Sequence, residues 1–159
     1  MRTFTLLLLS AVTAIGAEIS GVIKLDGPQP KRPPLQLTPE SRKLYEGQPY
    51  PRDEVELVSA KGEIKNVFVY IRKGLSPDKT YPVPKKAALL DQQRSMFRPR
   101  IQGLFVGQDF AMRNSDPIIH NVRSLSQENR PFNIAQPAGT PDRVKRFSDK
   151  EGPIELRCD

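Results

Sequence analysis

The chain has little of two residue types that carry chemistry, with one cysteine, Cys158, and one histidine, His120, among 159 residues. One cysteine cannot form an intramolecular disulfide. With one histidine no Ser-His-Asp set can be oriented, and no glycine-rich phosphate loop follows a predicted strand. Cys158 and His120 could pair as thiol and imidazole, but the end of the chain at Asp159 would leave such a site without walls. We therefore expect no enzyme.

Long apolar runs are also scarce. One covers residues 4–15, follows a short basic start and precedes the small residues Gly16 and Ala17. It is short for a bilayer span, so it predicts a secretory signal peptide over residues 1–17, whereas a retained membrane anchor would need a longer run. We expect a periplasmic or secreted protein with no transmembrane segment after cleavage.

The remaining chain is long enough for one domain. Removing 17 of 159 residues leaves 142, over residues 18–159, and loss of Arg2 lowers the formal net charge from +7 to about +6. The basic residues occur in scattered pairs without interleaved aromatic side chains, so no nucleic acid partner is expected. The charge would suit an acidic protein or an anionic membrane face, although a solvated surface is the simpler interpretation.

Short alternating runs separated by proline and glycine are typical of an all-β sandwich. We predict strands over residues 19–25, 54–59, 66–72, 87–91, 100–106, 109–114, 119–125, 144–148 and 154–158. Residues 66–72 are the most apolar of these, which places them in a sheet interior. Residues 39–45 could form one helical turn after a proline-dense stretch, and Gly107-Gln108 is a hairpin signal.

The positions of Cys158 and His120 leave their roles open. Ile154, Leu156 and Cys158 share one face of the last strand, so Cys158 is expected to point with the core, where a free thiol is commonly inert. His120 follows a turn whose Pro117 fixes φ, and this rigidity suits a ligand. From the residues alone, each side chain is either a metal ligand or an ordinary structural residue.

Seven motifs together carry a likeness to a known family. They are Lys65–Ile71, Leu90-Asp91-Gln92, Phe97-Arg98-Pro99-Arg100, Val106-Gly107-Gln108, Asn114-Ser115-Asp116-Pro117, His120-Asn121-Val122 and Arg157-Cys158-Asp159. In this order the chain resembles exported bacterial cupredoxin-like proteins related to plastocyanin and azurin, over nearly all of its mature length. The resemblance implies a Greek-key antiparallel β-sandwich of cupredoxin type.

The resemblance also implies a type 1 copper site that transfers electrons to a redox partner protein. His120 and Cys158 would be metal ligands, lying within about 10 Å of each other because both bind one ion. Asn121 would bridge to the segment that carries the cysteine and orient the site. Met112 and Met96 are expected to be packing residues, since the axial methionine of the family comes from beyond the cysteine.

The closing motif of the family usually runs Cys-Asp-Val-His-Pro-Trp-Met, and this sequence stops after Cys158-Asp159. We therefore expect a missing loop and last strand, with reduced stability and a tendency to associate. A trigonal blue-copper plane needs two imidazoles and a thiolate, so this chain alone should form no stable blue centre. The alternative is a metal-free β-sandwich that binds a polysaccharide or a protein partner.

Overall fold

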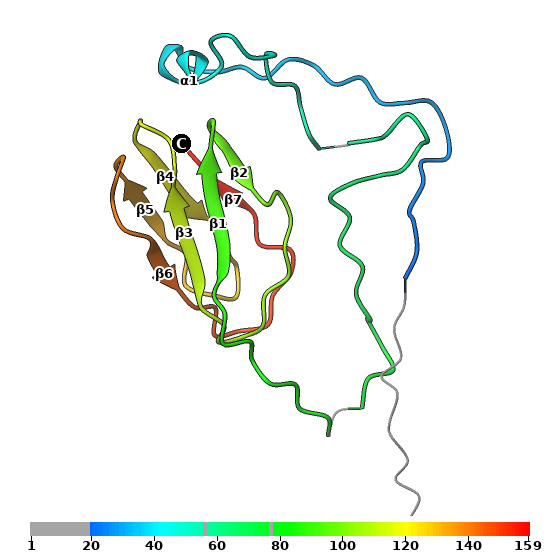
Figure 1. The fold of residues 1–159 in the computed structure, drawn as a ribbon. Helices are drawn as coiled ribbons and strands as arrows, with labels where there is room; N and C mark the ends of the chain where they lie inside the picture. The colour runs from blue at the N-terminus through cyan, green and yellow to red at the C-terminus, as the bar shows by residue number, and fades with distance from the viewer. Residues whose placement is uncertain (1–19, 56, 77) are drawn as a thin grey trace, which may run out of the picture.

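The computed structural model describes residues 20–55, 57–76 and 78–159, so the predicted signal peptide lies outside the described residues. In this part of the chain one short helix precedes a run of strands (Figure 1). The elements are α1 (Pro39–Lys43), β1 (Ala88–Gln93), β2 (Met96–Arg98), β3 (Phe110–Asn114), β4 (His120–Ser124), β5 (Asn133–Gln136), β6 (Arg143–Lys145) and β7 (Leu156–Arg157). The predicted all-β class is confirmed.

The strands form two sheets, ordered β2-β1-β3-β6 and β5-β4-β7, that face each other as a sandwich (Figure 1). The prediction of a wholly antiparallel fold is wrong, because β1 and β3 pair in parallel, from Ala88 opposite Phe110 to Gln92 opposite Asn114. Parallel neighbours require a crossover connection, and here β2 with residues 99–109 provides it. The other strand pairs are antiparallel.

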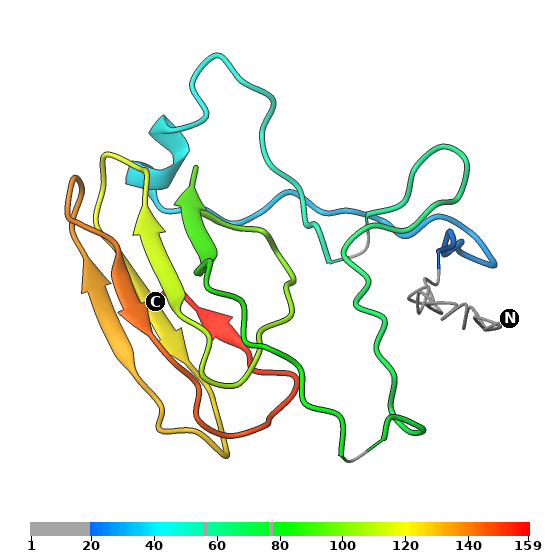
Figure 2. The same ribbon diagram turned by 60° about the horizontal axis from the view of Figure 1, so that its bottom comes forward.

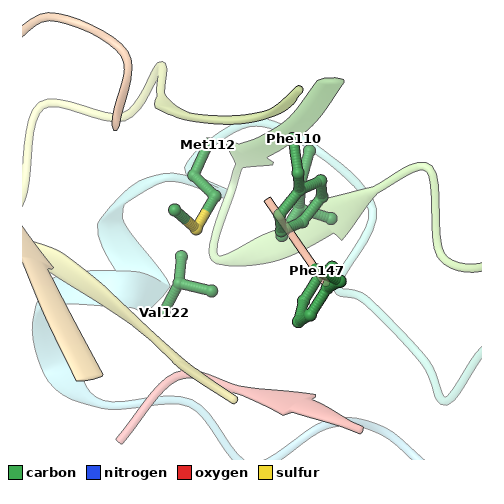
Figure 3. Packing of buried hydrophobic residues seen from close by; sticks show 5 residues of the cluster. Phe110, Met112, Val122 and Phe147 are labelled. Atoms are coloured by element: carbon green, nitrogen blue, oxygen red, sulfur yellow. The ribbon is translucent and has the colours of Figure 1, made fainter. Parts of the chain in front are cut away.

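The core lies between the two sheets and contains Met112 and Phe110 from β3 with Val122 from β4 (Figure 3). Met112 and Val122 are fully buried, which confirms the predicted packing role of Met112. Phe147 closes the cluster, with its ring centroid 5.8 Å from that of Phe110. Along β4 the buried positions alternate with half-buried ones, so His120 points inward on the same face as Val122.

Buried amides join the two sheets at one end of this core. Gln92 of β1 donates from Nε2 to Oε1 of Gln136 on β5 at 2.9 Å, and Gln136 donates to the Met112 carbonyl at 2.8 Å. Asn114 of β3 donates to the Gln136 carbonyl at 2.8 Å. Buried polar groups need hydrogen-bond partners because water does not reach them. These bonds therefore fix the position of one sheet relative to the other at the end where β4 begins.

The prediction that residues 66–72 form an interior strand is wrong. The segment has no strand pairing, and Val69 and Tyr70 are 73 % and 68 % exposed. Asn66 at its start has φ +60, and the Phe68 ring stacks on Tyr70 and lies against Gly103 instead of entering the core. An apolar run predicts burial, but a strand also needs a neighbour for its backbone hydrogen bonds.

Other predicted strands differ in extent. Residues 100–106 form no strand, so the hairpin predicted at Gly107-Gln108 is wrong: a turn at Phe105–Gln108 leads into β3, but the neighbours of β3 are β1 and β6. The strands predicted at 19–25 and 54–59 each include one residue outside the described ranges, 19 and 56; their described residues form only isolated bridges, Lys24 with Glu63 and Val58 with Ile64. β2 and β5 were not predicted from the sequence.

The described residues before β1 (20–55, 57–76 and 78–86) form an irregular N-terminal arm beside the sandwich, with α1 at the end of the sheets where β1 and β3 end (Figures 1 and 2). The predicted helical turn is confirmed, and Thr38 caps it by accepting a hydrogen bond from the Ser41 amide at 3.2 Å. The Tyr45 hydroxyl donates to the Arg94 carbonyl at 2.6 Å and so attaches the arm to the β1–β2 turn. No helix in the described residues is long and apolar enough to cross a membrane.

Candidate functional site

His120 is the first residue of β4 and is buried, with 7 % of its surface exposed. The turn before it is closed by Asn114, whose Nδ2 donates to the Ile118 carbonyl at 2.8 Å and whose Oδ1 accepts from the Asp116 amide at 2.9 Å. Asparagine forms such local bonds readily, and Pro117 restricts the backbone between them. The imidazole is therefore held by both the strand and the turn.

Cys158 directly follows β7, which pairs antiparallel with β4 from Arg123 opposite Arg157 to Ser124 opposite Leu156. This register brings the Cys158 Sγ atom to 3.6 Å from Nδ1 of His120, although 38 positions separate them. The two side chains thus lie well within the expected 10 Å. The Sγ atom thus meets a side chain on the inward face of β4, but the expectation of a buried thiol is wrong, because β7 is the outer strand of its sheet and Cys158, past its end, is exposed.

Asn121 forms the expected bridge between the two segments. Its backbone N–H lies 3.5 Å from Cys158 Sγ, and its side-chain Oδ1 accepts from the Asp159 amide at 2.7 Å. The Nδ2 group donates to Oδ1 of Asn133 on β5 at 2.7 Å, which fixes the amide from the other side. Asn121 therefore holds the sulfur next to the imidazole; whether it tunes a metal stays a prediction.

The contact between Cys158 and His120 favours charge on both groups. The hydrogen bond with Cys158 raises the pKa of His120 and is the largest cause of the shift; burial opposes it, and the contact with Asp116 adds a smaller contribution in the raising direction. The hydrogen bond with His120 lowers the pKa of the Cys158 thiol, helped by the Asn121 amide. The thiolate is the form of cysteine that binds metals and attacks electrophiles, so the arrangement prepares Cys158 for either chemistry.

The sequence analysis missed Asp116, which it treated only as part of a turn. Its Oδ2 atom lies 2.8 Å from Nε2 of His120, and both side chains are 6 % exposed. The same carboxylate accepts hydrogen bonds from the backbone amides of Arg94 at 2.6 Å and Ser95 at 2.7 Å. The available signal was a carboxylate four positions before the only histidine, but its contacts depend on how the turn folds.

The donor atoms fit a metal ion in part. An imidazole nitrogen at about 2.0–2.1 Å and a thiolate at about 2.3 Å from Zn²⁺, at a tetrahedral angle, lie about 3.6 Å apart. The distance from Nδ1 of His120 to Sγ of Cys158 is 3.6 Å, which also fits a hydrogen bond between the free groups. Asp116 contacts the opposite ring nitrogen, so it cannot bind the same ion.

A third donor is not found near this pair. Within residues 20–55, 57–76 and 78–159, no group of three or more histidine, cysteine, aspartate or glutamate side chains could hold a metal ion. The sequence contains no second histidine. A type 1 copper site needs three in-plane donors, of which His120 and Cys158 would supply two.

A groove of about 600 Å³ lies between the N-terminal arm and the β1–β2 hairpin. Its walls are rich in arginine and tyrosine, including Arg32, Arg52, Arg94 and Tyr45. Neither His120 nor Cys158 lines it, so it is separate from the pair described above.

Comparisons of the chain with protein-family models, with curated proteins and with solved structures found no match.

Proposed function

We propose that this chain belongs to a copper-binding electron carrier of cupredoxin type, in which His120 and Cys158 are two ligands of one copper ion. The observation that carries the proposal is the 3.6 Å approach of Nδ1 of His120 and Sγ of Cys158, two side chains 38 positions apart. Copper held by an imidazole and a thiolate supplies one-electron transfer between Cu(I) and Cu(II). The resemblance of the sequence motifs supports the same function.

The residues around the pair suit this role. His120 is held in a strand and a closed turn, so it would move little when the charge of an ion changes. The Asn121 amide points at the sulfur, and such hydrogen bonds tune the potential of a metal–thiolate site. Cys158 is exposed, which would let a redox partner protein approach the ligand closely. Export to the periplasm or the cell exterior, expected from residues 1–17, belongs to the same proposal.

The missing in-plane donor defines the experiment. Cu(II) added to the mature chain alone should give no stable, intense thiolate-to-copper absorption in the visible range, because one imidazole is lacking. Adding free imidazole should produce that absorption by supplying the second nitrogen. A second sample, with Val-His-Pro-Trp-Met joined after Asp159, should produce it without added imidazole.

The controls are Cys158→Ser and His120→Gln, each of which should abolish the absorption under both conditions. If neither imidazole nor the added segment gives a thiolate-to-copper band, His120 and Cys158 are not copper ligands. The metal-free binding module then becomes the better interpretation, and the exposed, stacked rings of Phe68 and Tyr70 would be the first surface to test with polysaccharides.

A further inference from the structure

Asp116 is a buried carboxylate that the proposed copper ligands do not include. It faces Nε2 of His120 at 2.8 Å on one side. On the other side the amides of Arg94 and Ser95 donate to Oδ1 at 2.6 Å and to Oδ2 at 2.7 Å. Both oxygens are therefore occupied, and the carboxylate cannot rotate away from the imidazole without losing these bonds.

We propose that Asp116 is a positioning residue, which keeps the proton of His120 on Nε2 and thereby directs the Nδ1 lone pair toward Cys158. A neutral imidazole has one donor nitrogen and one acceptor nitrogen, and a carboxylate only accepts. Asp116 lies 2.8 Å from Nε2, whereas the Cys158 sulfur, the weaker acceptor, lies 3.6 Å from Nδ1, so the hydrogen belongs on Nε2 and Nδ1 is left as the acceptor. A histidine that binds a metal commonly donates its other N–H to a carboxylate in this way. The relevance to copper rests on the proposed function, whereas the tautomer itself needs no metal.

The β1–β2 turn acts as the support of this carboxylate. Arg94 and Ser95 have φ +54 and +56, a region that side chains other than glycine adopt at a cost. Their two amides point together at Asp116, and the hydrogen bonds offset that cost. Ser95 also donates from Oγ to Oγ of Ser41 in α1 at 2.8 Å, so the N-terminal arm fixes the turn from outside.

The only histidine of the chain makes the tautomer directly measurable, because every imidazole signal in a ¹⁵N NMR spectrum belongs to His120. In the wild-type chain, at a pH where the ring is neutral, we expect the hydrogen on Nε2. Asp116→Ala should give a mixture of both tautomers. Asp116→Asn should give a larger share of the Nε2–H form than Asp116→Ala, since its oxygen can still accept from the ring, although its NH2 group replaces the acceptor of the Arg94 amide.

The matched control is Asp142→Asn, which removes one negative charge from an ion pair with Arg113 and leaves His120 untouched. It should give the wild-type tautomer. Because Asp116→Ala could also loosen the β1–β2 turn, the same substitution is made in a chain carrying Arg94→Gly and Ser95→Gly. Glycine adopts positive φ without strain, so this turn should form without the carboxylate.

A folded Asp116→Ala chain with the Nε2–H form unchanged, in either background, would overturn the proposal. Co(II) titration in the presence of imidazole gives the second readout. Asp116→Ala should weaken Co(II) binding on the order of 10- to 100-fold, as removal of such a partner typically does. If wild-type chain binds neither Co(II) nor copper, the copper function fails, and the NMR result still decides the role of Asp116.

Discussion

At the scale of single residues, Met112 contributes most clearly to the packing between the sheets. It is fully buried in the cluster with Phe110 and Val122 (Figure 3). Met112→Ala should lower the free energy of unfolding by about 2–5 kcal/mol, because it removes buried methylenes and leaves a cavity. Urea unfolding followed by circular dichroism measures this loss.

The control is Met96→Ala on the short edge strand β2, where the side chain is only half-buried. Its cost should be clearly smaller, since less apolar surface returns to water. Equal losses for the two alanine variants would mean that the core does not lie where the structure has it.

The residues of the candidate site could be named from the sequence only in part. The motif resemblance identified His120, Asn121 and Cys158, and the structure brings these three together. The alternation of side chains along residues 154–158 predicted a buried Cys158, which is exposed. Alternation shows which face of a strand a side chain is on, but not whether another element covers the end of that strand. Asp116 was missed for a similar reason: its contact with the β1–β2 turn joins residues over 20 positions apart.

At the scale of elements, the loop after β4 is held by one carboxylate. Glu151 accepts hydrogen bonds from the Gln127 amide at 2.6 Å, from the Ser126 hydroxyl, and from the amide and side chain of Asn129 at 3.2 and 3.0 Å. These bonds, led by the one from Gln127, lower the pKa of Glu151 to about 2. They favour the charged form, so the loop depends on pH.

Glu151→Gln should destabilise the chain at neutral pH, because an amide accepts these bonds less strongly. A lowered pKa stabilises the fold fully above the unfolded value of about 4.5, and this contribution is lost as the pH falls toward 2. The difference in urea midpoint between wild type and variant should therefore shrink over that range. Glu128→Gln is the control in the same loop: in the described residues its side chain makes no hydrogen bond, and its effect should be small at every pH.

Strands were predicted correctly where apolar and polar residues alternate and the segment also pairs with a neighbouring strand. The ranges 87–91, 109–114 and 119–125 correspond closely to β1, β3 and β4, which pair inside the two sheets. The range 66–72 failed although it is more apolar, because no strand in the described residues pairs with it. β5 was missed since its pairing with β4, and not its own pattern, makes Asn133–Gln136 a strand.

At the scale of the whole molecule, the N-terminal arm and the sandwich meet at the β1–β2 turn. Tyr45 is buried there and donates to the Arg94 carbonyl at 2.6 Å. Tyr45→Phe keeps the ring but removes this bond, which should cost about 0.5–1.5 kcal/mol. Since the bond joins the arm to the sheet, backbone amides around α1 should exchange hydrogen faster, as measured by mass spectrometry.

Tyr50→Phe is the matched control, because Tyr50 packs near Tyr45 but is 45 % exposed, and its hydroxyl makes no hydrogen bond in the part of the chain that the structure describes. Exchange around α1 should stay at the wild-type rate in this variant. Identical exchange in both variants would show that the hydrogen bond from Tyr45 to Arg94 does not hold the arm, and that its other contacts, such as the one between Ser95 and Ser41, are sufficient.

The shortness of β7 has a consequence for how the site behaves over time. Its two residues pair with β4 at the edge of their sheet, whereas the core strands are longer and enclosed. Edge segments with few bonds open locally, at a free energy well below that of global unfolding. Opening of β7 alone would carry Cys158 away from His120 while the sandwich stays folded. We therefore expect the contact between His120 and Cys158 to form and break in a local equilibrium, with a lifetime set by how often the short strand β7 opens.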